Sequence, residues 1–373
     1  MSESESKQAP RGYVRYRDDV EVVEPDEGEV IEKLIAAMLK GMALTRPKHG
    51  RTVRAAHAKA HGLVKGELRV LDGLPAPLRQ GLFAQARAYP VVARLSHVPG
   101  DLDDDRRVSG PRGLALKVLG VQGLGPMLPG HAGETTQDFL LDTGKVFNAV
   151  GPRAFLAQIA PVEHLAPRTP QALKGAVSAV SLATNTGLHA VGADSAVLDF
   201  FGHPFLHPLG EPYYSQAPIR YGDYLAKLNV TPDSPGLRAL VDAKLDVRDF
   251  DGLRQAVVAF FREHPAEFVM GVQLCTDLER MPVENANAEW PESESPYQPV
   301  ARLVLPAQDA YDPALQDAVD EAMLFSPSHS LAAHRPLGGI MRARMAVYEA
   351  VGRARREQNG QPVKEPRSAD DLP

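Results

Sequence analysis

The sequence predicts an α+β protein whose strands form an antiparallel sheet or barrel. Three observations support this fold class. Apolar segments of strand length come in clusters, segments with helical periodicity stand apart from them, and neither a strand–helix–strand alternation nor a repeat of fixed period is present. The 373 residues are enough for about two domains of ~150 residues, or for one large barrel domain.

The strand-like segments are short, rich in valine and leucine, and bounded by glycine, proline or aspartate. Within the first cluster, the acidic run Asp103-Asp104-Asp105 is expected to lie in a solvated loop. The predicted strands cover residues 51–72, 90–98, 114–121, 138–142, 217–230, 267–275 and 299–306.

The predicted helices are recognised by apolar residues three and four positions apart. The first begins after Asp26 or Glu27, and Val30, Leu34 and Met38 fall on one of its faces. Further predicted helices cover residues 152–159, 170–183, 251–264 and 338–356.

The chain is predicted to have one large folded domain with a short extension at each end. Residues 1–27 carry many charges and two prolines, so we expect a flexible N-terminal arm. Residues 28–356 hold the predicted strands and helices. Residues 357–373, EQNGQPVKEPRSADDLP, are almost entirely polar, and we expect them to form a disordered C-terminal tail.

Charge and cysteine content argue against several classes of protein. Forty-one lysines and arginines against forty-seven acidic residues give a net charge of −6, which argues against nucleic-acid binding. The single cysteine, Cys275, excludes an intrachain disulfide and a multi-cysteine metal centre. No apolar run reaches the ~18 residues of a membrane span, and the polar start MSESESKQAP is unlike a secretion signal. We therefore expect a cytoplasmic protein.

Two histidines in the segment RAAHAKAHG are the first candidates for a functional group. In isolation, His57 and His61 are interpreted as polar residues of an exposed strand. A zinc site is the second interpretation, because their spacing suits two metal ligands on a helix. Gly62 and Gly66 disfavour a helix, and no carboxylate follows His57 as that motif requires, so zinc is set aside.

An arginine in the apolar segment YPVVARLSHV is the second candidate. In a strand, Arg94 and Ser96 share one face with Val92 and Val98. Two interpretations remain open at this point. Arg94 lies in water on an edge strand, or it points inward and pairs with a carboxylate or a phosphate, because an unpaired buried charge is costly.

The last predicted helix carries the third candidate, the pair Arg344 and Tyr348. Four residues apart, their side chains lie on one face of the helix. An arginine that is hydrogen-bonded to a phenol oxygen favours the phenolate form, which is a good ligand for Fe(III). Alone, the pair is weak evidence, because such pairs are common on basic helices.

Taken together and in this order, the segments resemble the catalase family. RAAHAKAHGLVKGELRV is similar to the family's distal Arg-x-x-His-Ala-Lys segment, and VVARLSHVPG with GPRGLALKV is similar to its next two strands. Trp290-Pro, PVARLVLP, Phe325-Ser-Pro and Arg344-x-x-x-Tyr348 resemble its proximal end. The resemblance covers about residues 28–356. It implies a catalase-like haem-binding domain there, with an antiparallel β-barrel, surrounding helices, and the haem buried between the barrel and the proximal helix.

The resemblance implies a role for each candidate residue. Tyr348 would bind the haem iron as a phenolate, the ligand that catalases use, and Arg344 would keep its oxygen ionised. His57 would move the proton of the peroxide, and Ser96 would fix the tautomer of His57.

The remaining implied roles concern the rim of the haem. Arg54, Arg94 and Arg355 would pair with the propionates, and Phe147 would pack beside the haem plane. His57 and Arg54 have opposite parity in a strand, so both can face a haem only if the chain bends between them. We expect that bend.

One departure from the family concerns its distal asparagine, which has no counterpart in GETTQDFLLD. Glu134 is the best-aligned residue at that place, ahead of Thr135, Thr136 and Gln137. Because the asparagine helps to orient peroxide in the family, its loss argues against efficient catalase turnover. The short stretch of 25 residues after Tyr348 resembles small catalase-related proteins, some of which are peroxidases or rearrange fatty-acid hydroperoxides.

The expected function is that of a haem b enzyme, a peroxidase or weak catalase that reacts with hydrogen peroxide or an organic hydroperoxide. The alternatives are a lipid hydroperoxide isomerase or dehydratase, and a non-catalytic haem-binding protein. We also expect a homo-oligomer, since full-length members of the family are tetramers.

Overall fold

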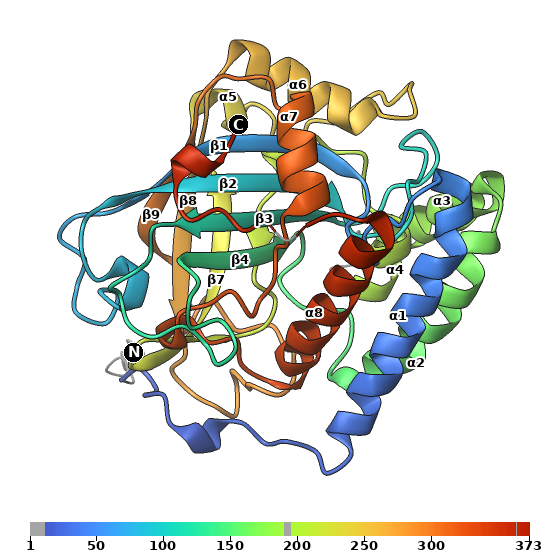
Figure 1. The fold of residues 1–373 in the computed structure, drawn as a ribbon. Helices are drawn as coiled ribbons and strands as arrows, with labels where there is room; N and C mark the ends of the chain where they lie inside the picture. Colours follow the sequence, from blue (N-terminus) through green and yellow to red (C-terminus); the bar gives the residue numbers. More distant parts are fainter. Residues whose placement is uncertain (1–11, 190–194, 363) are drawn as a thin grey trace, which may run out of the picture.

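The computed structural model describes residues 12–189, 195–362 and 364–373. In this part of the chain, strands in the order β5-β4-β3-β2-β1-β9-β8-β7 form an antiparallel sheet, and β5 pairs back with β7 to close it into an eight-stranded barrel (Figure 1). The short strand β6 pairs with β7. The strands are β1 (Ala60–Val70), β2 (Ala88–His97), β3 (Arg112–Leu119), β4 (Thr136–Asp142), β5 (Tyr213–Tyr214), β6 (Ile219–Tyr221), β7 (Tyr224–Pro232), β8 (Ala266–Leu274) and β9 (Gln298–Leu305).

The seam that closes the barrel is much shorter than its other strand pairs. Strand β5 meets β7 at Tyr213↔Val230 and Tyr214↔Asn229, and it meets β4 at the single pair Asp142↔Tyr214. By contrast, β2 and β3 pair without interruption from Val91↔Val118 to His97↔Arg112. Because β5 is so short, few ladder hydrogen bonds hold the barrel closed at this point.

Alternation along each strand separates the barrel interior from its outer face. On β2, Ala93 and Leu95 belong to the interior core, whereas Val92 packs outward in a separate cluster. The sequence-predicted faces of this strand are therefore confirmed. Since β2 lies between β1 and β3, the interpretation of Arg94 as a residue of an edge strand in water is wrong, and Arg94 is only 3% exposed.

Helices gather mainly on one side of the barrel, where α1, α2 and α8 pack together (Figure 1). Their shared core includes the predicted periodic positions Val30, Leu34 and Met38 of α1, together with Val347 of α8. The helices are α1 (Glu27–His49), α2 (Pro152–Leu165), α3 (Gln171–His189), α4 (Ala196–Phe201), α5 (Pro235–Arg238), α6 (Gly252–Glu263), α7 (Pro313–Leu315) and α8 (Gly339–Asn359).

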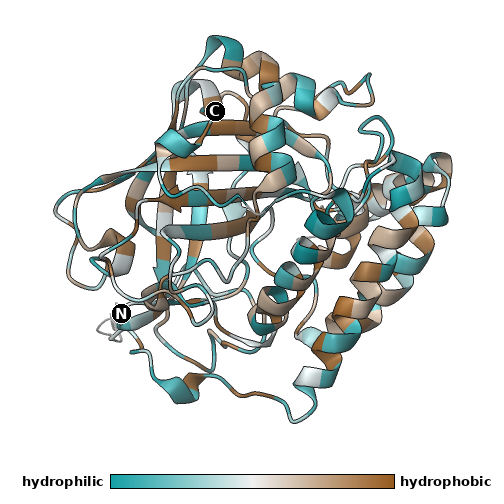
Figure 2. Ribbon diagram, in the orientation of Figure 1, coloured by the Kyte–Doolittle hydropathy of each residue, from teal (hydrophilic) through white to brown (hydrophobic). Residues whose placement is uncertain are grey.

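Hydropathy follows this arrangement. The strands are mostly hydrophobic, while the helices alternate hydrophobic and hydrophilic surface (Figure 2). The chain leaves α7 in a π-helical turn, Gln316–Ala322, which packs its Val319 over Val92 on the outside of the barrel. None of the helices in the described ranges combines the length and the apolar character that crossing a membrane requires.

The structure corrects two predictions, one about where the first strand begins and one about an acidic loop. The strand expected from residue 51 begins only at Ala60, because residues 51–59 form an irregular segment held by contacts with the end of β2. The acidic run is buried instead of solvated, and its Asp105 is fully covered. The Lys59 ammonium group lies 2.8 Å from the Asp105 carboxylate, and this pairing compensates the buried charge.

The described parts of both chain extensions pack against the barrel. In the arm, Val14 donates its amide hydrogen to Cys275 over 2.8 Å. In the C-terminal segment, Glu365 lies 3.2 Å from the buried Lys117 and accepts a hydrogen bond from the Leu324 amide. These contacts place the Glu365 carboxylate beside the buried ammonium group of Lys117. Residues 1–11 of the predicted arm lie outside the described residues.

Candidate functional site

A cavity lies between the outer face of the barrel and helix α8. Its inner part has a volume of about 680 Å³, and an adjoining outer part has about 1830 Å³ counted out to its opening. His57, Asp142, Arg344 and Tyr348 line both parts. The cavity therefore brings together residues that are almost 300 positions apart in the sequence.

The chain bends sharply at His57, just before β1. His57 adopts the left-handed backbone conformation with φ of 54°, which residues other than glycine rarely adopt. Its amide donates to the Val98 carbonyl over 2.9 Å, and the Ala58 amide donates to the Pro99 carbonyl over 3.1 Å. The predicted bend is thus confirmed, and both His57 and Arg54 line the inner cavity.

The imidazole of His57 is held on one side by Ser96. Its Nδ1 atom lies 3.1 Å from the Ser96 hydroxyl oxygen, on the outward face of β2. Burial lowers the pKa of His57 well below its usual value, and the positive charges of Arg94 and Arg344 lower it further. The ring is therefore neutral at neutral pH, and it can accept a proton.

Asp142, the last residue of β4, faces the other ring nitrogen of His57. Its Oδ1 atom lies 3.6 Å from His57 Nε2 and has no hydrogen-bond partner. Burial raises the pKa of Asp142 to about 6, an effect that the positive charge of Arg344 only partly offsets. Asp142 pairs with Gly113 on the neighbouring strand. Because Gly113 has no side chain, the His57 ring can occupy the space next to it.

Sequence reasoning missed Asp142. The register of the strand pair could have indicated this residue. It places the carboxylate at the end of the apolar strand β4, directly opposite Gly113 of the neighbouring strand β3. Glu134, the residue aligned with the family's distal position, is not among the residues that line the cavity. It precedes β4, whereas Asp142 ends it, and a strand rises by about 3.3 Å per residue. The strand itself thus keeps Glu134 away from His57.

Helix α8 supplies the opposite wall of the cavity. Arg344 and Tyr348 lie one turn apart, and the Arg344 guanidinium group donates a long hydrogen bond of 3.5 Å to the Tyr348 oxygen. Burial alone would lower the pKa of Arg344, but the charges of Tyr348 and Asp142 raise it above its usual value. Arg344 therefore stays charged, and it stabilises negative charge on the phenol oxygen.

The three arginines that were predicted to share one ligand do converge. Arg94 donates from Nε to Oδ1 of Asp320 over 2.8 Å, and Arg54 donates to the carbonyl oxygens of Asp320 and Met323. Arg355 donates to the Asp320 carbonyl oxygen over 3.3 Å. These carbonyl groups belong to the π-helical turn and to the residue that ends it.

This arginine cluster carries more positive than negative charge. Together with Arg51, the three arginines meet only two carboxylates, those of Asp320 and Glu321, so two positive charges are left unbalanced. Burial lowers the pKa of Arg54, and the charges of neighbouring arginines lower it further, while its buried Nε atom has no hydrogen-bond partner among the described residues and lies 3.6 Å from Asp320 Oδ1. The unbalanced positive charge favours the binding of an anion, and guanidinium groups bind carboxylates well.

The outer part of the cavity is mostly apolar. Phe147 lies on its wall and meets Phe155 edge to face, with ring centroids 5.0 Å apart. Glu163 is one of the acidic residues that line this part of the cavity, and burial raises its pKa to about 8. Further apolar wall residues come from helices α2, α3 and α4, and they include Ile159, Val162, Val177, Phe200 and Phe201.

The described architecture matches solved structures of catalases. No family model and no curated protein matches the sequence. A fungal catalase matches with a TM-score of 0.59 and 16% identity, over 95% of this chain and 67% of the catalase. Catalase A from Saccharomyces cerevisiae matches with a TM-score of 0.55 and 16% identity, over 94% of this chain and 68% of its own. A bacterial catalase matches with a TM-score of 0.56 and 14% identity, over 98% and 71%.

The chain has a catalase-like fold.

This catalase-like fold confirms the fold class and the resemblance that the sequence motifs indicated. At such low identity the match concerns the arrangement of the backbone. The residues that line the cavity therefore determine what chemistry it can perform. In this catalase-like chain, the candidate site residues implied by the resemblance line one cavity, except Glu134.

Proposed function

We propose that this chain is a haem enzyme that reduces hydrogen peroxide or an organic hydroperoxide. The observation that carries the proposal is a pair of dyads facing one cavity, His57 with Ser96 on the barrel and Arg344 with Tyr348 on α8. The catalase-like fold supports it, because the three solved structures compared above are catalases.

The residues of the cavity fit a haem. The Tyr348 oxygen is suited to bind the iron, and Arg344 stabilises its anionic form. The two unbalanced positive charges of the cluster formed by Arg51, Arg54, Arg94 and Arg355 match the two propionates of haem b. When bound, the haem would supply the iron redox chemistry that breaks an O–O bond.

The residues of the chain would handle the protons of this reaction. Reduction of ROOH to ROH and water consumes two protons and two electrons, and the electrons come from a second peroxide or from an organic reductant. With Nδ1–H donating to Ser96, Nε2 of the neutral His57 accepts the hydroperoxide proton and returns it to the departing oxygen. Asp142, 3.6 Å from Nε2, is a second ionisable group at the same place.

An organic hydroperoxide is favoured as substrate by the outer cavity. Its walls carry Phe155, Ile159, Val162 and Phe200, and apolar walls bind apolar molecules by removing their surface from water. The same observation supports the second candidate function, isomerisation or dehydration of a lipid hydroperoxide. Product analysis separates the two, since reduction yields one alcohol per two electrons consumed, whereas rearrangement consumes no reductant.

The proposal is tested by visible absorption spectra of the haem-reconstituted protein and of two variants, Tyr348→Phe and His57→Ala. We expect a Soret band in all three, an altered ferric spectrum in Tyr348→Phe, and a loss of at least ~100-fold in the rate of reaction with hydroperoxide in His57→Ala. A wild-type protein that takes up no haem would overturn the proposal. If His57→Ala reacts as fast as the wild type, the chain is a haem-binding protein without this catalytic machinery.

A further inference from the structure

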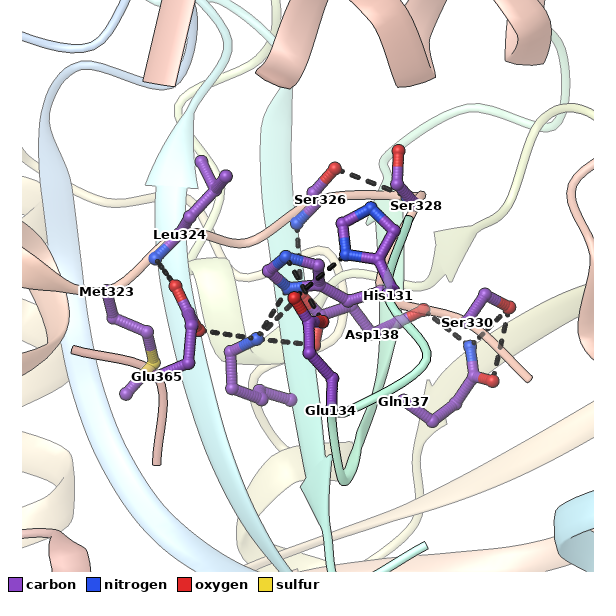
Figure 3. A network of polar contacts seen from close by, with 12 residues as sticks. His131, Glu134, Gln137, Asp138, Met323, Leu324, Ser326, Ser328, Ser330 and Glu365 are labelled. Carbon is purple, nitrogen blue, oxygen red and sulfur yellow. Dashed lines mark hydrogen bonds and ion pairs between the residues drawn. The ribbon is translucent and has the colours of Figure 1, made fainter. Parts of the chain in front are cut away.

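A second group of polar side chains gathers outside the cavity, where the loop before β4 meets the segment after β9 and helix α8 (Figure 3). His131 and Glu134 come from the loop, His329 from the later segment, and Glu349 from α8. Ligand atoms of His131, Glu134 and His329 lie within 4.8 Å of one another. Neither the proposed haem site nor its chemistry accounts for this group.

Glu134 makes one hydrogen-bond contact in this group and one contact at the distance expected between two ligands of a metal ion. Glu134 places Oε1 2.8 Å from His131 Nδ1, and it places Oε2 3.5 Å from His329 Nε2. Two ligands of a tetrahedral zinc ion, each at about 2.0–2.1 Å, are separated by about 3.4 Å. Glu134 Oε2 is buried without a hydrogen-bond partner, so a strong acceptor points at His329 with no donor satisfying it.

The side chains around His131, Glu134 and His329 carry a net negative charge. The carboxylates of Glu134, Asp138, Glu349 and Glu365 face the ammonium group of Lys117 and the guanidinium group of Arg356, which lies 4.0 Å from Glu365. Four negative charges therefore meet two positive ones before any histidine is protonated. A divalent cation would neutralise the difference.

A carboxylate behind His329 orients its ring. Asp138 Oδ2 lies 3.2 Å from His329 Nδ1, and Asp138 is itself fixed by Lys117 at 2.9 Å and by the Ser326 amide at 2.9 Å. Lys117 Nζ also lies 3.0 Å from His329 Nδ1, but the carboxylates of Asp138 and Glu365 are its stronger acceptors. With Nδ1–H donating to Asp138, Nε2 presents its lone pair toward Glu134. Histidine ligands of metal ions are held in this way by a carboxylate.

We propose that His131, Glu134 and His329 bind a divalent transition-metal ion, for which Zn²⁺ is the best-suited probe. Two imidazoles and one carboxylate suit zinc better than calcium or magnesium, which prefer oxygen ligands alone. Glu349 lies 3.0 Å from His131 Nε2, on the ring nitrogen that does not face Glu134, and would orient this ring as Asp138 orients that of His329. The bound ion would join the loop before β4 to the segment after β9.

The experiment compares zinc binding to the full-length protein and to three variants. Each protein is stripped with a chelator, equilibrated with Zn²⁺ and excess Mg²⁺, and dialysed, and zinc per chain is then measured by mass spectrometry. The variants are Glu134→Gln, His131→Gln and, as matched control, His264→Gln, which removes a histidine from the exposed His264–Glu263 pair. The thermal midpoint of each protein is recorded with and without Zn²⁺, and circular dichroism checks that each is folded.

We expect one zinc per chain in the wild type and in His264→Gln, and a zinc affinity at least ~100-fold weaker in the other two variants, since even the loss of an outer-shell partner costs 10–100-fold. Zn²⁺ should raise the thermal midpoint only where it is retained. Equal retention in the wild type and in Glu134→Gln, or none in either, would overturn the proposal. If both site variants fail to fold, titration of the wild type decides, because a zinc affinity no greater than that for Mg²⁺ contradicts the site. Zinc is counted separately from iron, so the outcome does not depend on haem.

Discussion

Gly113 lies so close to the His57 ring that a Cβ atom placed on it would stand 2.5 Å from Nδ1 and 2.6 Å from Cε1. Real side chains do not approach so closely, so the position of the candidate proton-transfer residue depends on the absence of a side chain at Gly113. The same Cβ atom would come within 3.1 Å of Asp142 Oδ1.

The first prediction follows from this contact. Gly113→Ala should displace the His57 ring and lower the rate of reaction with hydroperoxide by about 100-fold, the typical cost of misplacing a catalytic group by ~1 Å. Stopped-flow absorption of the haem-loaded protein measures that rate. Gly28→Ala, with no atom within 4 Å of its Cβ position, is the control and should leave the rate unchanged. A variant Gly113→Ala that reacts at the wild-type rate would show that His57 is not required in this position.

The second prediction concerns the pH dependence of the same reaction. Because the pKa of Asp142 is raised to about 6, its carboxyl group loses its proton as pH rises through that value. The ionised form stabilises a proton on His57, 3.6 Å away, so the reaction rate should increase between about pH 5 and 7. In Asp142→Asn this inflection should disappear. An inflection that persists in the variant would assign it to a different group.

A third prediction concerns stability and pH. The pKa of Glu163 is raised by burial to about 8, so between its ordinary value and pH 8 the folded protein holds a proton that the unfolded chain has lost. The free energy of unfolding should therefore decrease as pH rises through this range. Glu163→Gln should match the wild type at pH 4 and be more stable than it at pH 9, as measured by thermal midpoints. A stability difference that does not change with pH would mean that Glu163 is solvated.

The fourth prediction tests the buried ion pair on the outer face of the barrel. Lys117→Ala leaves Asp138 without its ammonium partner and should reduce the free energy of unfolding by about 3–5 kcal/mol. Chemical denaturation measures the change. Lys33→Ala removes an exposed lysine paired with Glu29 and should cost at most about 1 kcal/mol. Equal effects of the two substitutions would contradict the importance of burial at Lys117.

Much of the barrel could be predicted from the sequence, because alternation along a strand is a local property. The shared face of Arg94 and Ser96 followed from parity alone, and the helical pair of Arg344 and Tyr348 followed from a spacing of four. A bend near His57 was expected, but the irregular form of residues 51–59 was not, since His57 takes its left-handed conformation while its amide donates to the Val98 carbonyl just beyond β2.

The distal side of the cavity shows where sequence reasoning failed. Alignment to a family motif selected Glu134, whereas the pairing of β3 with β4 brings Asp142 to His57. The glycine-rich loop between these strands hides the register, because its length does not fix which residues become partners. The position of Glu365 was equally unpredictable, since its partners include a lysine more than 200 residues earlier in the chain.

The short seam of the barrel bears on how the protein moves. Strand β5 consists of Tyr213 and Tyr214, and Tyr214 is also the partner of Asp142. Local opening starts where the fewest ladder hydrogen bonds must break, so amide hydrogens at β5 should exchange with solvent sooner than those of β1 and β2. Each such opening would remove one of the two strand partners of Asp142, while its pairing with Gly113 of β3 remains. The side of Asp142 that faces β5 should therefore be more mobile than the side that faces His57 and Ser96.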